Sequence, residues 1–397
     1  MKAVVIGTGR IGCGVAAQLL RAAGLEIVFV GRNPQVVDHL NRVGRYIVRL
    51  VDSRSSEDFV VTGVRAVLSS DASRVAAEIA GADIVATAVG CGNLMSIAPL
   101  IASGLAQSRK RRTNVLAFEN FGSAGDCLSR FVAGCLKGTR RASTHAVSGA
   151  LVTRVVARRE GDPAGDEPLV FVGDRQATVY VDAATLAAPL PAVEGMVITD
   201  RYDAAVQRKL FTFSAGHATA AYLGYLKGYR YIHTAVCDPE IRADVLEAMA
   251  EGQKALLARY GPDIAGDERT LHEILSRFDN AALNDSIERV GRDPVRKLAK
   301  EDRLVGPACL AREAGIIPEK LMLAVAAAML FCPLADRAAM ELSRTIRCDG
   351  PTAALCRVSG FSPDDTLAAS AVRAYRRLAS ERPERSQLLS LEQPLWA

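Results

Sequence analysis

A glycine-rich turn near the N-terminus limits most strongly what this chain can fold into. Residues 2–6 (KAVVI) are typical of a short buried strand, and the sequence GTGRIG occupies residues 7–12. In such a turn the first glycine permits the bend, the second lets a phosphate approach the backbone, and the third lets a helix pack on the strand. The apolar periodicity of residues 11–23 predicts that helix, and residues 25–30 (LEIVFV) predict a second strand. The expected dinucleotide contacts are Gly7, Gly9, Arg10, Ile11 and Gly12.

The rest of the chain first alternates between strand-like and helical segments and then becomes mostly helical. Strand-like runs recur at 59–61, 84–89 and 114–118, with a helical segment at 94–105 between the last two. This alternation predicts an α/β fold with an N-terminal Rossmann-type doubly wound sheet covered on both faces. From about residue 202 the apolar spacing becomes helical. We therefore expect a dinucleotide-binding domain at 1–195 and a mostly α-helical substrate and catalytic domain at 196–397.

Composition excludes several other classes of protein. The 49 basic and 44 acidic residues give a net charge of +5, which is too small to indicate nucleic acid as a partner. The nine cysteines are scattered without a C-x-x-C pair, which favours a reducing compartment and disfavours a zinc site. No signal peptide is evident, and no apolar run is long enough to span a bilayer. The expectation is a cytoplasmic protein that binds neither a membrane nor a metal and is a monomer or homodimer.

The end of the second predicted strand bears on the choice of cofactor. An NAD site carries Asp or Glu there to bind the ribose 2′-hydroxyl, whereas this chain has Gly31, Arg32 and Asn33. A guanidinium can form a charge-assisted pair with the 2′-phosphate of NADP. We expect these residues to bind NADP(H) in preference to NAD(H). The alternative is that Arg32 is an ordinary exposed loop residue and either cofactor is used.

The stretch around Lys209 contains the candidate catalytic groups. On an α-helix Lys209 and His217 lie about 80° apart, and Ser214 is a one-turn neighbour of His217, so all three can face one cleft. A lysine among apolar residues can act as a base near neutral pH, and a histidine can donate to the substrate oxygen. The spacing alone is a weak signal, and by itself it favours a core histidine and a surface lysine that extends its charged end to solvent.

Residues 209–228 (KLFTFSAGHATAAYLGYLKG) resemble the signature of the polyol-specific long-chain dehydrogenases, the mannitol dehydrogenase family. Further matching pieces include GTGRIGCG, TAVG at 87–90, FENF at 118–121, RFDN at 277–280 and IERVGRDPVRKL at 287–298. Together they run in order from residue 1 to about 379. Within the family the resemblance is strongest to the mannitol-1-phosphate 5-dehydrogenases.

The resemblance implies metal-independent hydride transfer between a nicotinamide and a carbinol carbon. It implies Lys209 as general acid/base, His217 as the group that fixes and polarises the substrate oxygen, and Asn120 beside the nicotinamide and the substrate. Val89 falls in a cofactor-binding segment. The resemblance also implies substrate contacts at Asn120, Thr153, Arg154, Arg289 and Lys297.

Three positions depart from the family pattern. Ser214 stands where the family carries Asn, Thr153 where it carries Asp, and Gly31-Arg32 where it carries an acidic residue. We therefore expect a phosphorylated polyol or ketose substrate, either mannitol 1-phosphate and fructose 6-phosphate or a biosynthetic keto-sugar or keto-cyclitol phosphate. The alternatives are a cofactor-binding protein that has lost catalysis and a nicotinamide-assisted epimerase or cyclase.

Overall fold

The computed structural model describes residues 1–108, 112–138 and 145–381. The chain divides into two units, Met1–Val206 and Gln207–Ala397, and each is described by itself. The division comes later than the expected boundary after Gly195, because strand β12 (Met196–Thr199) still pairs in parallel with β11 (Val179–Asp182). The expected boundary therefore falls inside the sheet, and the short run that forms β12 was not distinguishable from a linker by its pattern.

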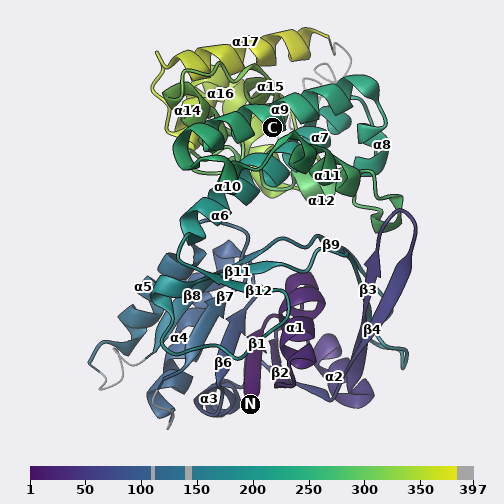
Figure 1. Ribbon diagram of the computed structural model, residues 1–397, viewed down its shortest axis with the longest axis vertical. Helices are drawn as coiled ribbons and strands as arrows, with labels where there is room; N and C mark the ends of the chain where they lie inside the picture. The colour runs from purple at the N-terminus through teal and green to yellow at the C-terminus, as the bar shows by residue number, and fades with distance from the viewer. Residues whose placement is uncertain (109–111, 139–144, 382–397) are drawn as a thin grey trace, which may run out of the picture. The chain divides into compact units, whose positions relative to one another are not determined.

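The N-terminal unit is built on an eight-stranded sheet with the order β12-β11-β8-β7-β6-β1-β2-β5 (Figure 1). The six strands from β5 to β8 run parallel, and β11 runs antiparallel to β8. The order reverses between β1 and β6, and a dinucleotide binds at such a switch point in a doubly wound sheet. The parallel strands are β1 (Lys2–Ile6), β2 (Glu26–Gly31), β5 (Val64–Leu68), β6 (Ile84–Thr87), β7 (Asn114–Ala117) and β8 (Ala146–Val152).

Both faces of this sheet are buried. Alternate residues of β1 belong to different apolar clusters: Val5 packs on the side of η1 (Gly12–Ala17), α1 (Gln18–Ala22) and α2 (Pro34–Val43). Val4 packs on the side of α3 (Ala72–Ala80), α4 (Leu94–Gln107) and α5 (Ala124–Leu136). The period of two and the continuous apolar runs together confirm the expected α/β class.

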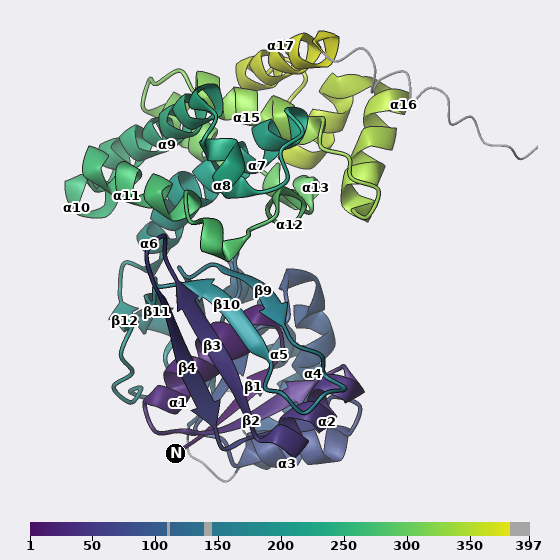
Figure 2. The same ribbon diagram turned by 90° about the vertical axis from the view of Figure 1, so that its right-hand side faces the viewer.

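A second sheet, with the order β4-β3-β10-β9, covers the face that carries α1 and α2 (Figure 2). Its strands are β3 (Arg45–Val51), β4 (Ser56–Thr62), β9 (Val156–Glu160) and β10 (Val170–Asp174). The fully buried ring of Tyr46 lies edge-on to Phe29 and Phe171, with centroids 5.9 and 5.5 Å away, and its hydroxyl donates to the Cys13 carbonyl. This packing joins the two sheets into one core.

The C-terminal unit is helical. Helix α7 (Ala215–Leu226) packs against α9 (Pro239–Tyr260), α12 (Ile287–Gly291) and α15 (Glu319–Met329). Small residues allow these close approaches, because a Cβ at Gly216 would meet the Met249 sulfur of α9 at 2.5 Å and one at Gly224 would meet Cδ1 of Ile287 in α12 at 2.7 Å. The other helices are α8 (Ile232–Val236), α10 (Pro262–Ala265), α11 (Glu268–Phe278), α13 (Pro294–Lys297), α14 (Val305–Glu313), α16 (Arg337–Ser359) and α17 (Thr366–Ser380). None of the described helices is long and apolar enough to cross a membrane.

Candidate active site

The glycine turn leads from the end of β1 into the π-helical turn η1. Gly7 has φ +118°, and a Cβ there would lie 2.4 Å from the Ala88 carbonyl oxygen. A Cβ at Gly12 would lie 2.0 Å from the Gly7 oxygen, but one at Gly9 would meet nothing within 4 Å. The fold itself therefore requires Gly7 and Gly12, whereas Gly9 borders open space in which a ligand can approach the backbone. This fits the pyrophosphate of a dinucleotide.

Two further residues of the turn are fixed by the protein around them. Arg10 donates from Nη1 to the Ala157 carbonyl of β9 at 2.8 Å, and Ile11 packs partly buried against the core. Arg10 therefore braces the turn, and Ile11 anchors the beginning of the helix.

The end of β2 has no room for an acidic side chain at position 31. A Cβ on Gly31 would lie 2.8 Å from a Val37 methyl and 3.0 Å from the Thr8 methyl. Asn33 caps α2, with its Oδ1 accepting from the Gln35 amide at 2.9 Å. Arg32, between them, is exposed. The capping oxygen of Asn33 is thus used by the helix, whereas the exposed side chain of Arg32 can meet a ligand.

Glu119 is a buried carboxylate next to Asn120 that sequence reasoning did not assign. Its two oxygens accept from the backbone amides of Val89 and Gly90 at 2.8 and 2.9 Å. Burial raises the pKa of Glu119, and the two amide hydrogen bonds oppose this. Glu119 thus fixes the loop after β6, and Asn120 is exposed in the bend after β7. The signal was present in the FENF segment, where an acidic residue directly follows a buried strand.

Thr153 and Arg154 hydrogen-bond to the protein itself. Arg154 is 4% exposed, and it donates from Nη1 to the Gly14 carbonyl at 2.8 Å and from Nε to the Gln176 carbonyl at 2.8 Å. Thr153 donates from Oγ1 to the Thr178 carbonyl at 2.7 Å. The contact with Gly14 joins the segment after β8 to η1. Both side chains therefore hold the fold together, which does not favour the substrate contacts expected of them.

The segment that carries Lys209 is not one continuous α-helix. Helix α6 (Tyr202–Lys209) ends at Lys209, the π-helical turn η4 (Leu210–Ser214) follows, and α7 begins at Ala215. The 80° expected between Lys209 and His217 therefore does not hold, because a π-turn contains an extra residue. Thr212 donates to the Arg208 carbonyl at 2.6 Å, across the junction. Turns of this kind recur at functional sites.

Lys209 has the electrostatic environment of a base. Burial lowers its pKa to about 7, and the nearby cations Arg303, Arg277 and Arg296 add to this, while Asp302 opposes it. The side chain nevertheless keeps partial exposure. A lysine with this pKa exists in both protonation states at neutral pH, as acid/base catalysis requires.

His217 is held by a carboxylate that sequence reasoning missed. Its Nε2 lies 3.2 Å from Oδ2 of Asp285, and its ring stacks on Phe278 with centroids 4.9 Å apart and an interplanar angle of 8°. Arg289 binds both oxygens of the same carboxylate. Burial lowers the pKa of His217, although Asp285 works in the opposite direction. Ser214 lies buried at the end of η4, one residue before α7 begins.

Asp285 remains ionised in this setting. Burial acts to raise its pKa, but Arg289 and His217 outweigh burial and hold the pKa well below its usual range. Its position four residues before Arg289 on the chain was the available signal, since residues at this spacing can pair at the start of a helix.

Lys297 belongs to a basic cluster around Lys209. Its Nζ donates to the Arg292 carbonyl, and burial together with Arg303 and Arg296 lowers its pKa well below the ordinary value. Arg303 and Arg296 share Asp302, at 2.6 and 2.9 Å. Among the described residues, this basic cluster comprises Lys209, Arg277, Arg289, Arg296, Lys297 and Arg303, against Asp285, Asp293 and Asp302.

The charge of the basic cluster favours an anionic ligand. Its four arginines outnumber its three aspartates, and its two lysines have lowered pKa values that reflect burial and repulsion by neighbouring cations. An incoming phosphate would relieve that repulsion and favour the protonated lysines. In the part of the chain that the structure describes, no group of three His, Cys, Asp or Glu side chains is placed to hold a metal ion.

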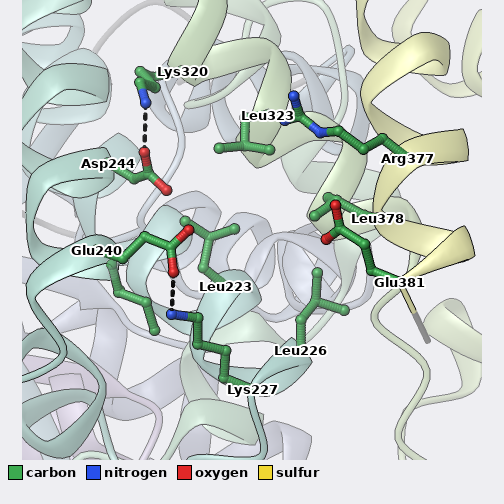
Figure 3. A pocket seen from close by; sticks show the side chains of 11 residues that line it. Leu223, Leu226, Lys227, Glu240, Asp244, Lys320, Leu323, Arg377, Leu378 and Glu381 are labelled. Carbon is green, nitrogen blue, oxygen red and sulfur yellow. Dashed lines mark hydrogen bonds and ion pairs between the residues drawn. The ribbon is translucent and has the colours of Figure 1, made fainter.

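A separate pocket of about 520 Å³ lies in the C-terminal unit (Figure 3). Its lining includes Leu223, Leu378 and two facing ion pairs, Lys320 with Asp244 at 2.7 Å and Lys227 with Glu240 at 2.5 Å. It contains none of the expected site residues. Because its charges neutralise each other, this pocket does not attract an anion as the basic cluster does.

Comparisons with known proteins agree with these observations. A model of the mannitol dehydrogenase Rossmann domain matches residues 1–172, and one of the mannitol dehydrogenase C-terminal domain matches residues 202–375. The fold is similar to that of Pseudomonas fluorescens mannitol 2-dehydrogenase, solved in a ternary complex with NAD and D-mannitol, with 18% identity and a TM-score of 0.82 over 99% of this chain and 95% of that chain.

Two other structures share the fold. A D-sorbitol dehydrogenase in substrate-free form has 15% identity and a TM-score of 0.75, over 96% of this chain and 93% of that chain. A ketopantoate reductase from Ralstonia eutropha has 21% identity and a TM-score of 0.50, over 83% and 98%. The two family models together account for most of the sequence and for both units. The chain therefore belongs to the mannitol dehydrogenase family, oxidoreductases with a Rossmann domain that binds a nicotinamide cofactor.

Proposed function

We propose that this protein is an NAD(P)-dependent dehydrogenase that interconverts a phosphorylated polyol and the corresponding ketose phosphate. The observation that carries the proposal is Lys209, a lysine whose pKa is lowered to about 7 by burial and by the cations of the basic cluster. A base of this strength is what an alcohol dehydrogenase without a catalytic metal needs at neutral pH.

The chain's own part of the reaction is the movement of one proton. In polyol oxidation the neutral Lys209 amine takes the proton of the carbinol hydroxyl as the carbon–oxygen double bond forms. In ketose reduction the Lys209 ammonium returns that proton to the oxygen. When bound, the nicotinamide accepts or supplies the hydride at the same carbon. Gly7, Gly9 and Gly12 would hold its pyrophosphate, and Val89 and Asn120 lie in the loops after neighbouring strands.

The basic cluster supports a phosphorylated substrate over a neutral sugar alcohol. Lys297 and Arg303 are the proposed phosphate partners. Arg289 is bound to Asp285 through two of its nitrogens, whereas Arg303 meets Asp302 through Nε and has a buried Nη2 without a hydrogen-bond partner among the described residues. Arg289 then acts mainly by holding Asp285. Mannitol 1-phosphate with fructose 6-phosphate is the first candidate pair. Because Ser214 is shorter than the asparagine of the family, a biosynthetic keto-sugar or keto-cyclitol phosphate is the second candidate substrate.

The start of α2 supports NADP(H) as the cofactor. Gly31 leaves no space for the acidic side chain that would repel a 2′-phosphate, and Arg32 is exposed beside it. NAD(H) is the competing cofactor, since the Pseudomonas relative was solved with NAD.

The test is a turnover assay with purified protein, fructose 6-phosphate and either NADPH or NADH, followed by absorbance of the reduced cofactor. We expect faster turnover with NADPH, and a loss of about 100-fold or more in Lys209→Ala, which removes the acid/base. Lys227→Ala, which changes a lysine of the separate pocket, serves as the control and should leave the rate unchanged.

Other outcomes point to the alternatives. Cofactor binding without turnover on any phosphorylated ketose would favour a protein that has lost catalysis. Cofactor that co-purifies and is never consumed, while a sugar phosphate is isomerised, would favour an epimerase or cyclase. Equal efficiency with NADH and NADPH would contradict the role of Arg32.

A further inference from the structure

The turn between α12 and α13 has a backbone conformation that ordinary side chains rarely adopt. Asp293 has φ +59° and ψ +65°, and with Asn284 it is one of two residues other than glycine, among those that the structure describes, with a positive φ. Asn284 directly precedes Asp285, and Asp293 pairs with Arg296, so both adjoin or belong to the basic cluster. Such conformations persist only where the surrounding structure holds them, and they concentrate at functional sites.

Asp336 holds this turn with one oxygen while its other oxygen caps a helix. Oδ2 of Asp336 accepts from the backbone amide of Asp293 at 2.7 Å. Oδ1 accepts from the amides of Ala338 and Ala339 at 3.1 and 3.2 Å, at the start of α16. Helix α13, which follows the turn, packs against α16 (Figure 2). The two oxygens of one carboxylate therefore have two separate tasks.

The residue that ends α12 is held from the same side. A Cβ at Gly291 would lie 2.7 Å from the ring of Phe331, five residues before Asp336. The carbonyl of Gly291 accepts from the Tyr222 hydroxyl at 2.9 Å. Helices α12 and α13 contain only five and four residues, which is too short for a helix to be stable by itself. Their directions are therefore set by tertiary contacts such as these.

Hydrogen bonds connect the turn to the cations of the basic cluster. Oδ2 of Asp293 accepts from Nε of Arg296 at 3.2 Å, and Nη1 of Arg296 donates to Asp302 at 2.9 Å. Asp302 in turn accepts from Nε of Arg303 at 2.6 Å. Lys297 is the last residue of α13, the helix that the turn begins. The conformation of the turn thus bears on the positions of both Lys297 and Arg303.

We propose that Asp336 is a positioning residue for the anion site of the basic cluster. By binding the Asp293 amide it keeps the turn in its left-handed form, and the turn directs Lys297 and Arg303 toward the phosphate of the substrate. The inference rests on the proposed function, because that function supplies the phosphate. Asp336 acts through the turn and not on the proton that Lys209 transfers, so its contribution is to binding.

Asp336→Ser separates the two tasks of the carboxylate. Serine caps a helix about as well as aspartate, but its single oxygen on a shorter arm cannot also bind the Asp293 amide. Asp365→Ser is the matched control. Asp365 caps α17 by accepting from the Leu367 amide at 2.8 Å, and it also pairs with Arg312 at 2.8 Å. Each variant therefore keeps a helix cap and loses one other carboxylate contact.

Thermal unfolding shows whether the two variants are folded to a similar extent. Should Asp336→Ser fail to fold, Asp336→Asn takes its place. An asparagine amide has one accepting oxygen, so it also cannot perform both tasks.

The first measurement is steady-state kinetics with fructose 6-phosphate and with unphosphorylated fructose at high concentration. In Asp336→Ser we expect KM for fructose 6-phosphate to rise about 10-fold, while kcat changes less than about 2-fold and turnover of fructose is unaffected. Asp365→Ser should leave both sugars unchanged. An unchanged KM for fructose 6-phosphate would overturn the proposal, as would an equal loss with both sugars, which is the result expected of a general structural defect.

The second measurement is calorimetric binding of fructose 6-phosphate and of inorganic phosphate, which needs no turnover. We expect both ligands to bind Asp336→Ser about 10-fold more weakly than Asp365→Ser. If this difference is found but no ketose phosphate is reduced, the proposed function is wrong and the role of Asp336 is correct. If fructose 6-phosphate is reduced and both variants bind equally well, the reverse holds. If the unmodified enzyme binds neither ligand, the anion site and the role of Asp336 both fail.

A third variant tests whether Asp336 acts through the turn. Asp293→Ala places an alanine in the left-handed region, where its Cβ is unfavourable, and removes the contacts with Arg296. It should by itself raise KM for fructose 6-phosphate. Because Asp293→Ala and Asp336→Ser disturb the same turn, the double variant should bind little worse than the weaker single variant. Full additivity of the two losses would contradict the proposal.

Discussion

At the scale of single residues, Lys209 shows how catalysis and stability oppose each other. The burial and neighbouring cations that lower its pKa to about 7 are unfavourable for the ammonium that the unfolded chain carries up to its ordinary pKa of 10.5. The same environment makes Lys209 an effective base. Its pKa therefore has consequences for rate and for stability that can be measured separately.

The rates of the two directions should depend on pH with opposite sign. Oxidation needs the neutral amine, so kcat/KM for the polyol should rise with pH through about 7 and then level off. Reduction needs the ammonium, so its rate should fall above about 7. The measurement is kcat/KM against pH in both directions, with Lys227→Gln as the control. A rise centred near pH 10 would show that the Lys209 pKa is not lowered.

Replacing Lys209 by methionine should stabilise an inactive protein. The folded pKa is lowered, so between about pH 7 and 10.5 the unfolded chain binds more protons, and wild-type stability falls as pH decreases through that range. Lys209→Met removes this penalty and should add about 0.5–2 kcal/mol to the free energy of unfolding at pH 7. The gain should shrink toward pH 10. Denaturant unfolding at both pH values measures it, and a gain independent of pH would exclude the electrostatic origin.

At the scale of elements, two irregular turns shape the candidate site as much as the regular helices and strands do. The glycine turn and the π-turn η4 each place backbone where a regular element would not. In both, a specific glycine permits a close approach: Gly12 to the Gly7 carbonyl, and Gly252 of α9 to the Phe211 carbonyl.

The glycines of the first turn should separate folding from binding. Gly9→Ala adds a methyl group into open space, so stability should change by less than about 0.5 kcal/mol while NADPH binding weakens about 10-fold or more. Gly12→Ala places a Cβ 2.0 Å from the Gly7 oxygen and should destabilise the fold by about 2 kcal/mol or more. Nicotinamide fluorescence and thermal unfolding distinguish the two effects. If Gly9→Ala binds NADPH normally, the pyrophosphate does not lie against Gly9.

The π-turn should be sensitive to the helix that packs on it. A Cβ at Gly252 would lie 2.1 Å from the Phe211 oxygen, so Gly252→Ala must push α9 away from η4. We expect a loss of about 2 kcal/mol or more in stability and a fall in kcat. The matched control is Gly134→Ala in α5, where a Cβ meets nothing within 4 Å and should stabilise by about 0.5–1 kcal/mol. Full activity and stability in Gly252→Ala would contradict the η4 contact.

At the scale of the whole molecule, the net charge of +5 is modest, but the basic cluster concentrates positive charge around Lys209. Charged groups that focus a field on a binding site raise the local concentration of an oppositely charged substrate. The effect is screened by salt over about 8–10 Å at physiological ionic strength.

The proposed phosphate recognition should therefore depend on ionic strength. Raising sodium chloride from low to physiological concentrations should lower kcat/KM for fructose 6-phosphate several-fold, roughly as expected for screened attraction. Turnover of unphosphorylated fructose, if measured at high concentration, should change much less. Equal salt dependence for the two sugars would argue against a phosphate contact with the basic cluster.

Much of the fold and part of the candidate site could be predicted from the sequence. Alternation along β1 and β2 and the glycines of the turn predicted the doubly wound sheet, because these signals are local and repeat with the period of the element. Lys209, Ser214 and His217 lie within one short segment, so their proximity was also predictable. The later boundary at Val206 was not, because β12 is too short to show a period.

The sequence by itself determined which groups could do chemistry: the glycine turn, the lysine and the histidine. Only the tertiary structure decided how those groups behave. It brought Asp285 to His217 and Arg303 near Lys209, and it placed Gly252 against the π-turn, all from segments distant in the chain. It also gave the hydrogen bonds of Arg154 to the backbone. The physical reason is that a pKa and a hydrogen-bond partner depend on burial and on neighbours in space, and local sequence patterns carry little information about either.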